Sequence, residues 1–481
     1  MDNSKPAEKP MDMTPDEFKQ WGYQFIDWVS DYLAHPERLH VLSQVKPGDI
    51  RKQLPVSPPP SPESMSSVLK DMDNIIVPGL THWNHPDFFA YFPNTGSGPG
   101  ILGELLSAAL NVNGMVWRTA PAVTELEEHV LGWLRELIGL PKAFKGIVHD
   151  TASVSTFHAL AAARETVTER NVRDEGIGGP NAPCLRIYAS EQAHSSVDKG
   201  AMAIGIGRRG LVKIPTDAEF RMDPAALDAA IQRDLNEGRR PFCVVATVGT
   251  TSTTSIDPVP AIADICEKYG LWLHVDAAYA GSAAIVPEMQ YILDGCSRAD
   301  SLVTNPHKWL LTPVDFSAFY CRRPDMLKRA FSLTAEYLTT DEGEEVTNAM
   351  DYSLELGRRF RALKFWMVIR YFGVDGLRDV IREHIRLGKL FASLVQADSR
   401  FEIVAPVPFS SVCFRLRRSD AENEALIDRV NATGKIFISH TRLNDKLTIH
   451  FTVGNLRTTE AHVRAAWELI QGVVGTDHSI P

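Results

Sequence analysis

Lys308 is the residue whose position most clearly suggests chemistry. It follows an apolar run that begins at Leu302, and it lies between His307 and Trp309. An ammonium group at the mouth of a buried strand loses much of its hydration energy unless it is paired or gives up its proton. The sequence therefore predicts that Lys308 either has a charged partner or uses a lowered pKa.

Other polar residues follow the neighbouring apolar runs of the same region. They are Asp150 with Thr151, Ala152 and Ser153, then His194, Thr251 and Asp276. Because ligands bind at the carboxyl ends of the strands in an open parallel sheet, we expect these side chains to lie together. A helix that begins near Ala152 would offer free N–H groups to a phosphate, and helix capping by Asp150 or Thr151 is an equal alternative.

The residue types in this set favour one kind of site over two others. A metal site would need more converging carboxylates or histidines, and the sequence shows no G-x-S-x-G turn of the kind used in acyl transfer. Pyridoxal 5′-phosphate needs a lysine for its aldehyde, a carboxylate for its pyridine nitrogen and a phosphate pocket. We therefore predict a pyridoxal-phosphate site that contains Lys308 and Asp276, and no metal.

The elements that position this set alternate between strands and helices. Seven apolar runs lie between GIVHD (146–150) and SAFYCRR (317–323), with helical segments among them. This order is typical of an α/β fold with a mostly parallel sheet covered on both faces. Beyond about residue 375, the short strands FEIVAP (401–406), SVCFRLRR (411–418) and KLTIHFTVG (446–454) indicate a small α+β domain. We predict an N-terminal helical segment (1–97), a large cofactor-binding domain (98–370) and a C-terminal domain (371–481).

One glycine motif competes with this interpretation. Gly205 to Gly210 matches G-x-G-x-x-G, which in a dinucleotide-binding fold follows a strand and opens a helix. Here the motif follows a predicted helix and leads into a strand. We therefore interpret it as a turn.

The first helix is predicted to begin after Thr14. Thr14, Pro15 and Glu17 provide an N-cap, a proline at the first helical position and a capping box. One stripe of this helix carries Phe18, Trp21, Phe25, Trp28, Val29 and Tyr32. The proline-rich segment 55–64 separates the helix from the rest of the chain, so the stripe covers either the same chain or a second subunit.

Composition excludes several classes of protein. The chain has 481 residues, a formal net charge of −10 and 44% hydrophobic residues, and its pI is near 5.9, which argues against a nucleic-acid-binding protein. No apolar run approaches the length of a membrane span, and the N-terminus lacks the apolar core of a signal peptide. We expect no membrane partner and a cytoplasmic location, where the six scattered cysteines would be reduced.

The chain resembles the group II pyridoxal-phosphate-dependent decarboxylases, in particular the aromatic-L-amino-acid decarboxylase branch. The similarity runs from about Thr14 into the C-terminal region. It is carried by PGLTHWNHPDFFAYFP (78–93), PAVTELE (121–127), EQAHSS (191–196), HVDAAYAG (274–281), NPHKW (305–309) and LGRRFRALKFW (356–366). The resemblance implies the aminotransferase-like fold of pyridoxal-phosphate enzymes (fold type I).

The resemblance also implies a role for individual residues. Lys308 would bind the cofactor aldehyde, Asp276 would pair with the pyridine nitrogen, and His194 and Ala278 would cover the two ring faces. The residues implied to lie around the phosphate are Ala152, Ser153, Asn305 and His307, with Thr251 near the cofactor and the substrate carboxylate. The family forms homodimers with the N-terminal segment wrapped over the partner, and Gly357 would reach the neighbouring subunit's site.

The resemblance further implies the reaction and its alternatives. Tyr337 matches the proton-donating tyrosine of the family and, with His194, favours release of CO₂ and an arylalkylamine. The alternatives are an aromatic aldehyde synthase and a non-catalytic dimeric scaffold. The retained Lys308 and Asp276 disfavour the scaffold.

The substrate is expected to be an aromatic L-amino acid. The predicted pocket residues are Trp83, Tyr91, Phe92, Pro93, Asn113 and Met115. The alternative for these aromatic residues is plain core, which we expect for Phe89 and also for Trp83. Because Gly357 has no side chain, a ring larger than imidazole would fit, so tryptophan, tyrosine, DOPA and phenylalanine stay open. Two places depart from the family pattern: the stretch from Asn113 to Arg118, and His450, where the family commonly has arginine.

Overall fold

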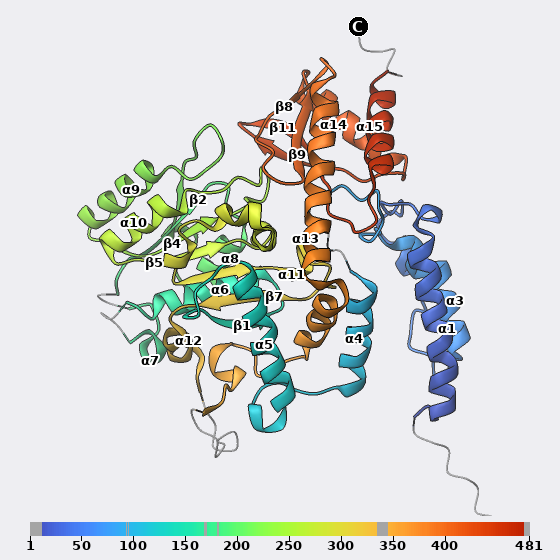
Figure 1. Ribbon diagram of the computed structural model, residues 1–481, viewed down its shortest axis with the longest axis horizontal. Helices are drawn as coiled ribbons and strands as arrows, with labels where there is room; N and C mark the ends of the chain where they lie inside the picture. The colour runs from blue at the N-terminus through green and yellow to red at the C-terminus, as the bar shows by residue number, and fades with distance from the viewer. Residues whose placement is uncertain are drawn as a thin grey trace, which may run out of the picture.

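The computed structural model describes residues 12–92, 94, 96–167, 171–179, 182–333 and 345–475. Its centre is a seven-stranded sheet with the strand order β1-β7-β6-β5-β4-β2-β3 (Figure 1). The strands are β1 (Lys145–His149), β2 (Leu185–Ser190), β3 (Leu211–Ile214), β4 (Arg240–Thr247), β5 (Trp272–Asp276), β6 (Ser301–Thr304) and β7 (Ser317–Cys321). The sequence prediction of seven strands in this region is confirmed.

Strand direction follows from the connections between the strands. Five strands that are neighbours in the sheet, β6, β5, β4, β2 and β3, pair in parallel. Strand β7 is antiparallel to both β1 and β6. The link from β6 to β7 contains only the four-residue helix α11 (Pro306–Trp309), which is too short for the crossover that a parallel pair requires. The mostly parallel sheet is therefore confirmed.

Both faces of the central sheet are apolar and covered by helices. Alternate strand residues such as Ile147 and Val148 belong to separate hydrophobic clusters on opposite faces. One cluster includes residues of α6 (Ala152–Arg164), α8 (Ser196–Ala203) and α12 (Pro324–Phe331). The other includes residues of α5 (Pro121–Leu137), α9 (Pro224–Asn236), α10 (Val259–Tyr269) and α13 (Arg361–Gln396). Helix α4 (Gly98–Leu110) contacts α13, and the short α7 spans Val172–Glu175.

A second sheet lies near the C-terminus. Its order is β10-β11-β9-β8, and all its pairs are antiparallel. The elements are β8 (Phe401–Ile403), β9 (Ser411–Leu416), α14 (Asp420–Ala432), β10 (Ser439–Leu443), β11 (Lys446–Thr452) and α15 (Glu460–Gly475). Strand β10 was missing from the sequence prediction because it is a partly exposed edge strand with His440 and Arg442 among its residues. Helix α13 joins the two sheets and is interrupted at Gly373, where φ is 65°.

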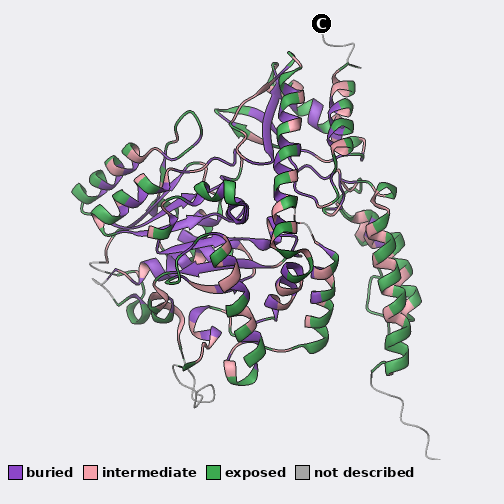
Figure 2. Ribbon diagram, viewed as in Figure 1, coloured by how far each residue is buried: buried purple, intermediate pink, exposed green. Residues whose placement is uncertain are grey.

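The N-terminal helices form an arm at one side of the molecule (Figure 1). They are α1 (Pro15–Ala34), α2 (Asp49–Gln53) and α3 (Met65–Asp71). The capping box from Thr14 to Glu17 is present, which confirms the predicted helix start. No residue of α1 is buried, and Phe18 and Tyr23 are 62% and 63% exposed (Figure 2). Only part of the aromatic stripe contacts its own chain, as where Trp28 donates a hydrogen bond to Asp73.

Three further sequence predictions can be compared with the structure. Gly205 to Gly210 connects α8 to β3, with positive φ at Gly205 and Gly207, so it is a turn. All six cysteines are free thiols. Among the described residues, no helix has the length and apolar character needed to cross a membrane.

Candidate active site

Lys308 lies in α11, directly after the carboxyl end of β6. Trp309 fixes this short helix because its ring stacks on Tyr279 at 4.6 Å and its Nε1–H donates to His384. Lys308 Nζ lies 5.3 Å from the centroid of the Phe92 ring. Burial lowers the pKa of Lys308, and the Asp276 charge partly opposes that shift. A fraction of the amine is therefore neutral and nucleophilic nearer to neutral pH than a free lysine would be.

Asp276 is the last residue of β5, next to β6 in the sheet. Its side chain is buried, and Oδ1 accepts a hydrogen bond of 3.1 Å from the Ala278 N–H. The Ala278 carbonyl in turn accepts from the Asn305 N–H at 2.9 Å. These bonds tie the ends of two neighbouring strands together, so that the carboxylate is held close to the loop that precedes Lys308.

His194 follows β2, at the same edge of the sheet. Its Nδ1 accepts a hydrogen bond of 3.1 Å from the Ser196 N–H, so the neutral ring carries its hydrogen on Nε2. Partial burial lowers the pKa of His194. The Asp276 charge raises this pKa, and the Lys308 charge lowers it further. The structure thus brings His194, Asp276 and Lys308 within electrostatic reach of one another, and we call these three residues the strand-end group.

The N-terminus of α6 is free of side-chain capping in the described structure. Asp150 forms an ion pair with Arg361 instead, and the Thr151 side chain makes no capping bond. Ser153 is exposed in the first turn. Of the two alternatives that the sequence left open, side-chain capping is therefore absent, and the first N–H groups of α6 remain available to an anion.

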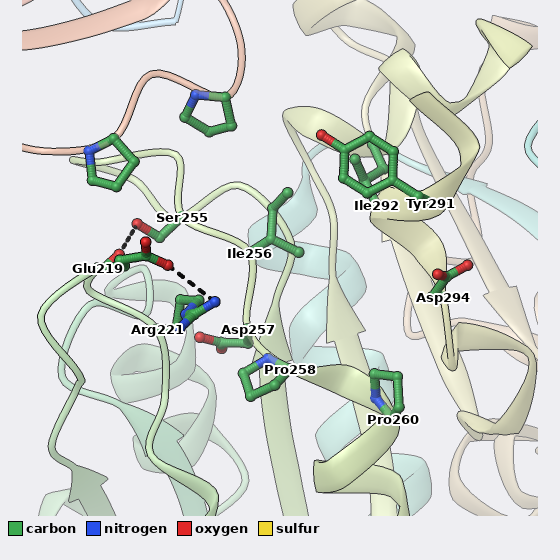
Figure 3. A pocket seen from close by; sticks show the side chains of 12 residues that line it. Glu219, Arg221, Ser255, Ile256, Asp257, Pro258, Pro260, Tyr291, Ile292 and Asp294 are labelled. Carbon is green, nitrogen blue, oxygen red and sulfur yellow. Dashed lines mark hydrogen bonds and ion pairs between the residues drawn. The ribbon is translucent and has the colours of Figure 1, made fainter. Parts of the chain in front are cut away.

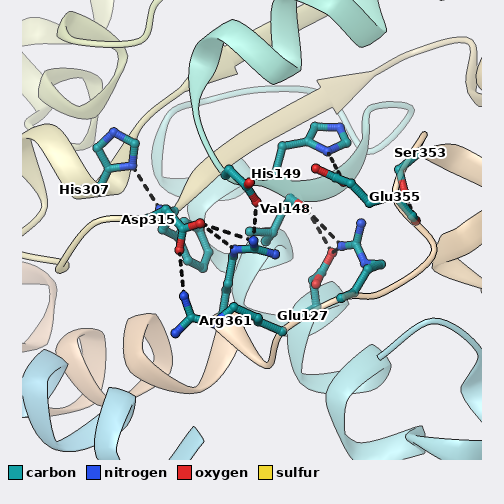
Figure 4. A network of polar contacts seen from close by, with 12 residues as sticks. Glu127, Val148, His149, His307, Asp315, Ser353, Glu355 and Arg361 are labelled. Atoms are coloured by element: carbon teal, nitrogen blue, oxygen red, sulfur yellow. Dashed lines mark hydrogen bonds and ion pairs between the residues drawn. The ribbon is translucent and has the colours of Figure 1, made fainter. Parts of the chain in front are cut away.

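A polar network connects the start of α6 to α11 (Figure 4). Arg361 contacts both Asp150 and Asp315, the latter at 3.2 Å. The next residue, Phe316, donates its N–H to His307 Nδ1 at 2.9 Å. Burial, with help from Lys308 and Lys364, lowers the pKa of His307 to about 3. His307 is consequently a neutral hydrogen-bonding group, and its Nε2 lies 3.3 Å from the Asn305 amide.

Two buried histidines lie beside this network. His149 and His158 stack at 4.1 Å, and with Glu355 they form the one group of potential metal ligands found among the described residues. Both nitrogens of His158 are already used, one on the Val154 carbonyl and one accepting from the Leu354 N–H. Stacked rings also direct their lone pairs side by side, which is poor geometry for one ion.

Aromatic residues form a wall next to Lys308. Phe92 stacks on Tyr279 at 3.9 Å. Trp83 and Tyr91 stack on each other at 5.8 Å, and they are 37% and 51% exposed. Phe89 is fully buried, as expected of a core residue. The prediction that Trp83 is also core is wrong, because Trp83 stays partly exposed even though its ring stacks on Phe88 at 4.6 Å.

The remaining predicted residues form a second group on two loops. Asn113 Oδ1 accepts the Arg358 N–H at 2.9 Å, and the Gly114 N–H donates to the Arg358 carbonyl at 2.9 Å. These bonds place Asn113, Met115 and Gly357 close together. We call the two loops that carry these three residues the loop pair. Within the described structure, no hydrogen bond or ring contact joins the loop pair directly to the strand-end group. Tyr337 and Pro93 lie outside the described residues.

Sequence reasoning missed two residues that organise the site. Tyr279 supports both Phe92 and Trp309, and Arg361 holds the start of α6. Both belong to motifs that had been noticed, HVDAAYAG and LGRRFRALKFW. The signal was therefore present, but a motif does not say which of its side chains turns toward the site.

A separate cavity of about 320 Å³ lies between the loops after β3 and β4 (Figure 3). Its lining includes Glu219, Arg221, Ser255, Ile256, Asp257, Pro258, Pro260, Tyr291, Ile292, Asp294, Pro406 and Pro408. None of these residues was predicted to take part in the chemistry. Hydroxyl groups of Thr250, Thr253 and Ser255 form a hydrogen-bonded row between this cavity and the end of β4. The cavity is therefore distinct from the strand-end group.

Comparison with known proteins agrees with this geometry. Residues 47–417 match the pyridoxal-dependent decarboxylase conserved domain. The chain belongs to this decarboxylase family. It is 42% identical to tyrosine decarboxylase 3 of Petroselinum crispum, covering 97% of this chain and 93% of the relative. It is 41% identical to a phenylacetaldehyde synthase of Arabidopsis thaliana, covering 96% of each.

A solved structure extends the similarity to the fold. The Oryza sativa TDC, crystallised with PLP and tryptamine, superposes with a TM-score of 0.93 at 37% identity, covering 97% of this chain and 99% of that chain. The predicted fold of pyridoxal-phosphate enzymes is therefore confirmed, and pyridoxal phosphate is the cofactor. The residues present fit it, because a lysine with a lowered pKa, a buried carboxylate and an uncapped helix start lie at one sheet edge.

Proposed function

We propose that this decarboxylase acts on an aromatic L-amino acid and releases CO₂ and the arylalkylamine. The observation that carries the proposal is the position of Lys308 Nζ over the Phe92 ring, within reach of the Asp276 charge. A reactive amine is thus combined with an aromatic wall. The similarity to a tyrosine decarboxylase and to the TDC crystallised with tryptamine supports the same substrate class.

Each residue of the strand-end group has a task that its surroundings suit. Pyridoxal phosphate, when bound, supplies a ring that accepts the electrons released as the bond to the substrate carboxylate breaks. Lys308 would hold the cofactor aldehyde, and its lowered pKa favours the neutral amine that attacks a carbonyl. Asp276 would keep a proton on the pyridine nitrogen. His194 would cover one face of the cofactor as a flat, neutral ring, with Ala278 on the other.

The phosphate is assigned to residues at the start of α6 and around α11. Ala152 and Ser153 offer uncapped backbone N–H groups, and Asn305 and His307 offer neutral side chains. Because an amide oxygen can only accept, Asn305 would meet a phosphate oxygen through its Nδ2–H groups. We place Thr251 near the substrate carboxylate, because it is exposed in the loop after β4.

The aromatic wall suits loss of a carboxylate. A charged carboxylate is stabilised by water, so a site that excludes water favours its departure as CO₂. Trp83, Tyr91 and Phe92 would provide that apolar surface. Pro93, Asn113 and Met115 complete the set assigned to the substrate.

We infer a homodimer in which each active site uses residues of both subunits. The exposed residues Phe18 and Tyr23 of α1 leave an apolar surface without a partner in the described chain, and α4 exposes Leu102, Leu105, Leu106 and Leu110. The separation of the loop pair from the strand-end group supports the same inference. The cytoplasmic location, the absence of nucleic-acid and membrane partners, and the division at residues 97 and 370 remain predictions.

Gly357 supports a substrate with a large ring. Its φ is not left-handed, and the nearest atom to an added Cβ is Asn113 Nδ2 at 4.0 Å. Its own chain therefore does not require glycine at this position. Space for a ring of the neighbouring subunit's substrate would explain it, which keeps tryptophan, tyrosine, DOPA and phenylalanine as candidates.

Formation of an amine or an aldehyde depends on the proton delivered after CO₂ leaves. We assign that proton to Tyr337, a phenol, and His194 points the same way. The phenylacetaldehyde synthase among the relatives makes an aldehyde synthase the second candidate. A scaffold without activity is disfavoured, since Lys308 and Asp276 are both present and close together.

The test incubates the cofactor-bound enzyme with each of the four amino acids while CO₂, amine, aldehyde and oxygen uptake are measured. We expect equal amounts of CO₂ and amine, with little oxygen consumed. Stoichiometric aldehyde and hydrogen peroxide would instead establish the synthase. No product from any of the four would contradict both activities.

A further inference from the structure

The second sheet has two faces of different character. One face is apolar and packs under α13, α14 and α15, with Ile449 and Phe451 in its core. The other face carries Thr448, His450 and Thr452 on β11, all buried although polar. Buried polar residues are retained where they find partners or serve a ligand. We call this second surface the polar face.

The polar face packs against the loops that border Lys308. Ser439, His450 and Cys413 are direct neighbours across β10, β11 and β9, so their side chains point to the same side. Ser439 Oγ accepts the Tyr91 N–H at 3.2 Å. Cys413 Sγ donates to the Ser252 carbonyl at 3.0 Å. His450 lies between these two contacts.

His450 contacts one residue of the aromatic wall, Phe92. Its ring meets the Phe92 ring edge to face at 6.0 Å, and Lys308 Nζ lies 5.3 Å from the centroid of that same ring. His450 and the reactive amine therefore both border the same phenyl ring. A substrate bound at Lys308 and extended along Phe92 would carry its own ring toward His450.

One nitrogen of His450 is left without a hydrogen bond. The neighbouring hydroxyl groups of Ser439, Thr441, Ser411 and Thr452 all have partners. His450 Nδ1 lies 3.5 Å from Thr452 Oγ1, whereas Nε2 is buried without a partner among the described residues. The residue is only 4% exposed. A buried nitrogen without a partner destabilises the protein unless a bound molecule satisfies it.

The surroundings of His450 favour a neutral ligand atom over a carboxylate. Burial alone lowers the pKa of His450 to about 4, so the ring is neutral at physiological pH. Burial accounts for the shift at His450, whereas the charges of Asp276 and Lys308 also act on His194. A neutral imidazole suits a phenol hydroxyl or an indole N–H.

We propose that His450 is a specificity-determining residue whose Nε2 hydrogen-bonds a polar atom on the aromatic ring of the substrate. This inference rests on the proposed function, because it requires an aromatic amino acid at Lys308. It assigns the enzyme to substrates whose ring bears a hydrogen-bonding atom, in preference to rings of carbon alone. Phenylalanine would accordingly be a poor substrate.

The test compares substrates that differ by one hydrogen-bonding atom. The pairs are tyrosine with phenylalanine, and tryptophan with 1-methyltryptophan, assayed as kcat/KM on the cofactor-bound enzyme. We expect the wild type to prefer the polar member of the pair that it uses. His450→Phe keeps the aromatic volume and should reduce that preference roughly 10-fold, whereas His450→Gln should retain much of it.

The matched control is His440→Phe, on the exposed edge of the same sheet, which should leave the preference unchanged. Equal treatment of both pair members by the wild type would overturn the proposal. An unchanged preference in His450→Phe would overturn it as well, as would an equal loss on both members.

A binding measurement separates this inference from the proposed function. Calorimetry with tyramine and phenethylamine gives the same pairwise comparison without turnover. If no amino acid releases CO₂ but tyramine binds more tightly than phenethylamine only while His450 is present, the reaction is wrong and the ring contact is right. If CO₂ is released and both amines bind alike to every variant, the ring contact is wrong.

Discussion

The strand-end group and the loop pair are built in different ways. Asp276 is buried at the end of a strand, and Lys308 is fixed by the packing of Trp309 directly after one. Asn113 and Gly357 are exposed and lie on two loops joined by hydrogen bonds from the Arg358 N–H to Asn113 Oδ1 and from the Gly114 N–H to the Arg358 carbonyl. The first group is complete within one chain, whereas the second faces outward.

This difference separates two requirements of the enzyme. Reactive groups need fixed geometry and a low dielectric, which the interior of one sheet provides. Residues that select the substrate can lie on surface loops, and a second subunit can cover such loops. Chemistry and choice of substrate should therefore respond differently to mutation.

The largest effect is expected for Lys308→Ala. Removing the amine should abolish the visible absorbance of the bound cofactor and reduce kcat by more than about 10³-fold, because no other described lysine lies in the strand-end group. Absorbance spectra and CO₂ release measure the two effects. Retention of the absorbance band would show that another residue holds the cofactor.

Asp276→Asn should follow, with kcat reduced by about 10²-fold or more at an unchanged fold, because the neutral amide cannot hold a proton on the pyridine nitrogen. Asp300→Asn is the matched control. Asp300 is also a buried carboxylate, but it lies just before β6, at the opposite end of that strand. A comparable loss of kcat per folded protein in both variants would refute the special role of Asp276.

Charged substitutions on the N-terminal arm should lower activity by weakening the association of two subunits. The double variant Phe18→Asp with Tyr23→Asp places charges at two exposed aromatic positions of α1. We expect the inferred dimer to shift to monomer, with roughly 10-fold loss of activity. Sedimentation velocity measures the assembly. Leu235→Asp, on the outer helix α9, should leave the dimer intact. An arm variant that remains dimeric would place the interface elsewhere.

Substitution at Gly357 tests substrate choice directly. Gly357→Ser should leave the melting temperature unchanged, since an added Cβ meets no close atom of its own chain, but should alter the ratio of kcat/KM for tryptophan and tyrosine by about 10-fold. The contrast is Gly388→Ala, whose Cβ would lie 2.6 Å from the Ser410 backbone and should destabilise the fold. An unchanged substrate ratio would remove Gly357 from the pocket.

The smallest effect concerns pH and stability. Burial lowers the pKa of His274 and of His384 to about 4, and of His307 to about 3. The unfolded chain therefore binds protons first, so stability is complete above pH 6.5 and is lost as pH falls toward 4, by roughly 1 kcal/mol per pH unit for each histidine. Asp257, whose pKa burial raises to about 6, acts in the opposite direction.

Thermal unfolding at pH 7, 6 and 5 measures this balance. We expect the melting temperature to fall with each step, because burial also lowers the pKa of His85 and of His450 to about 4, whereas Asp257 is joined only by Asp87, whose pKa burial raises to about 7. A melting temperature that rises on acidification would contradict the assignment of these histidines as neutral in the folded state.

The sequence predicted the strand-end group better than its surroundings, for a physical reason. Strand ends are set by local apolar runs, so the positions of Asp276 and Lys308 could be inferred without any long-range contact. The partners of Phe92 could not, because Tyr279 approaches it from the loop after β5 and His450 from β11 of the second sheet. Local patterns do not encode such tertiary contacts.

The same distinction explains the errors in the fold. The capping signals at Thr14 and Pro15 located α1 correctly, because they act within a single turn. Strand β10 was missed because its edge position allows polar residues such as Arg442. The division of the chain into three units, with boundaries at residues 97 and 370, stays a prediction. Helix α13 runs across the second boundary and is interrupted only at Gly373.

The polar face also has a consequence for the order in which the protein is made. The hydrogen bond from Tyr91 to Ser439 joins residues 348 positions apart, and the wall beneath Lys308 is complete only when β11 has docked. During synthesis the chain can therefore fold its central sheet, with Lys308 and Asp276 in place, before its substrate pocket exists. Closing such long loops is slow, so the nascent enzyme would acquire the means to hold its cofactor before it could select a substrate.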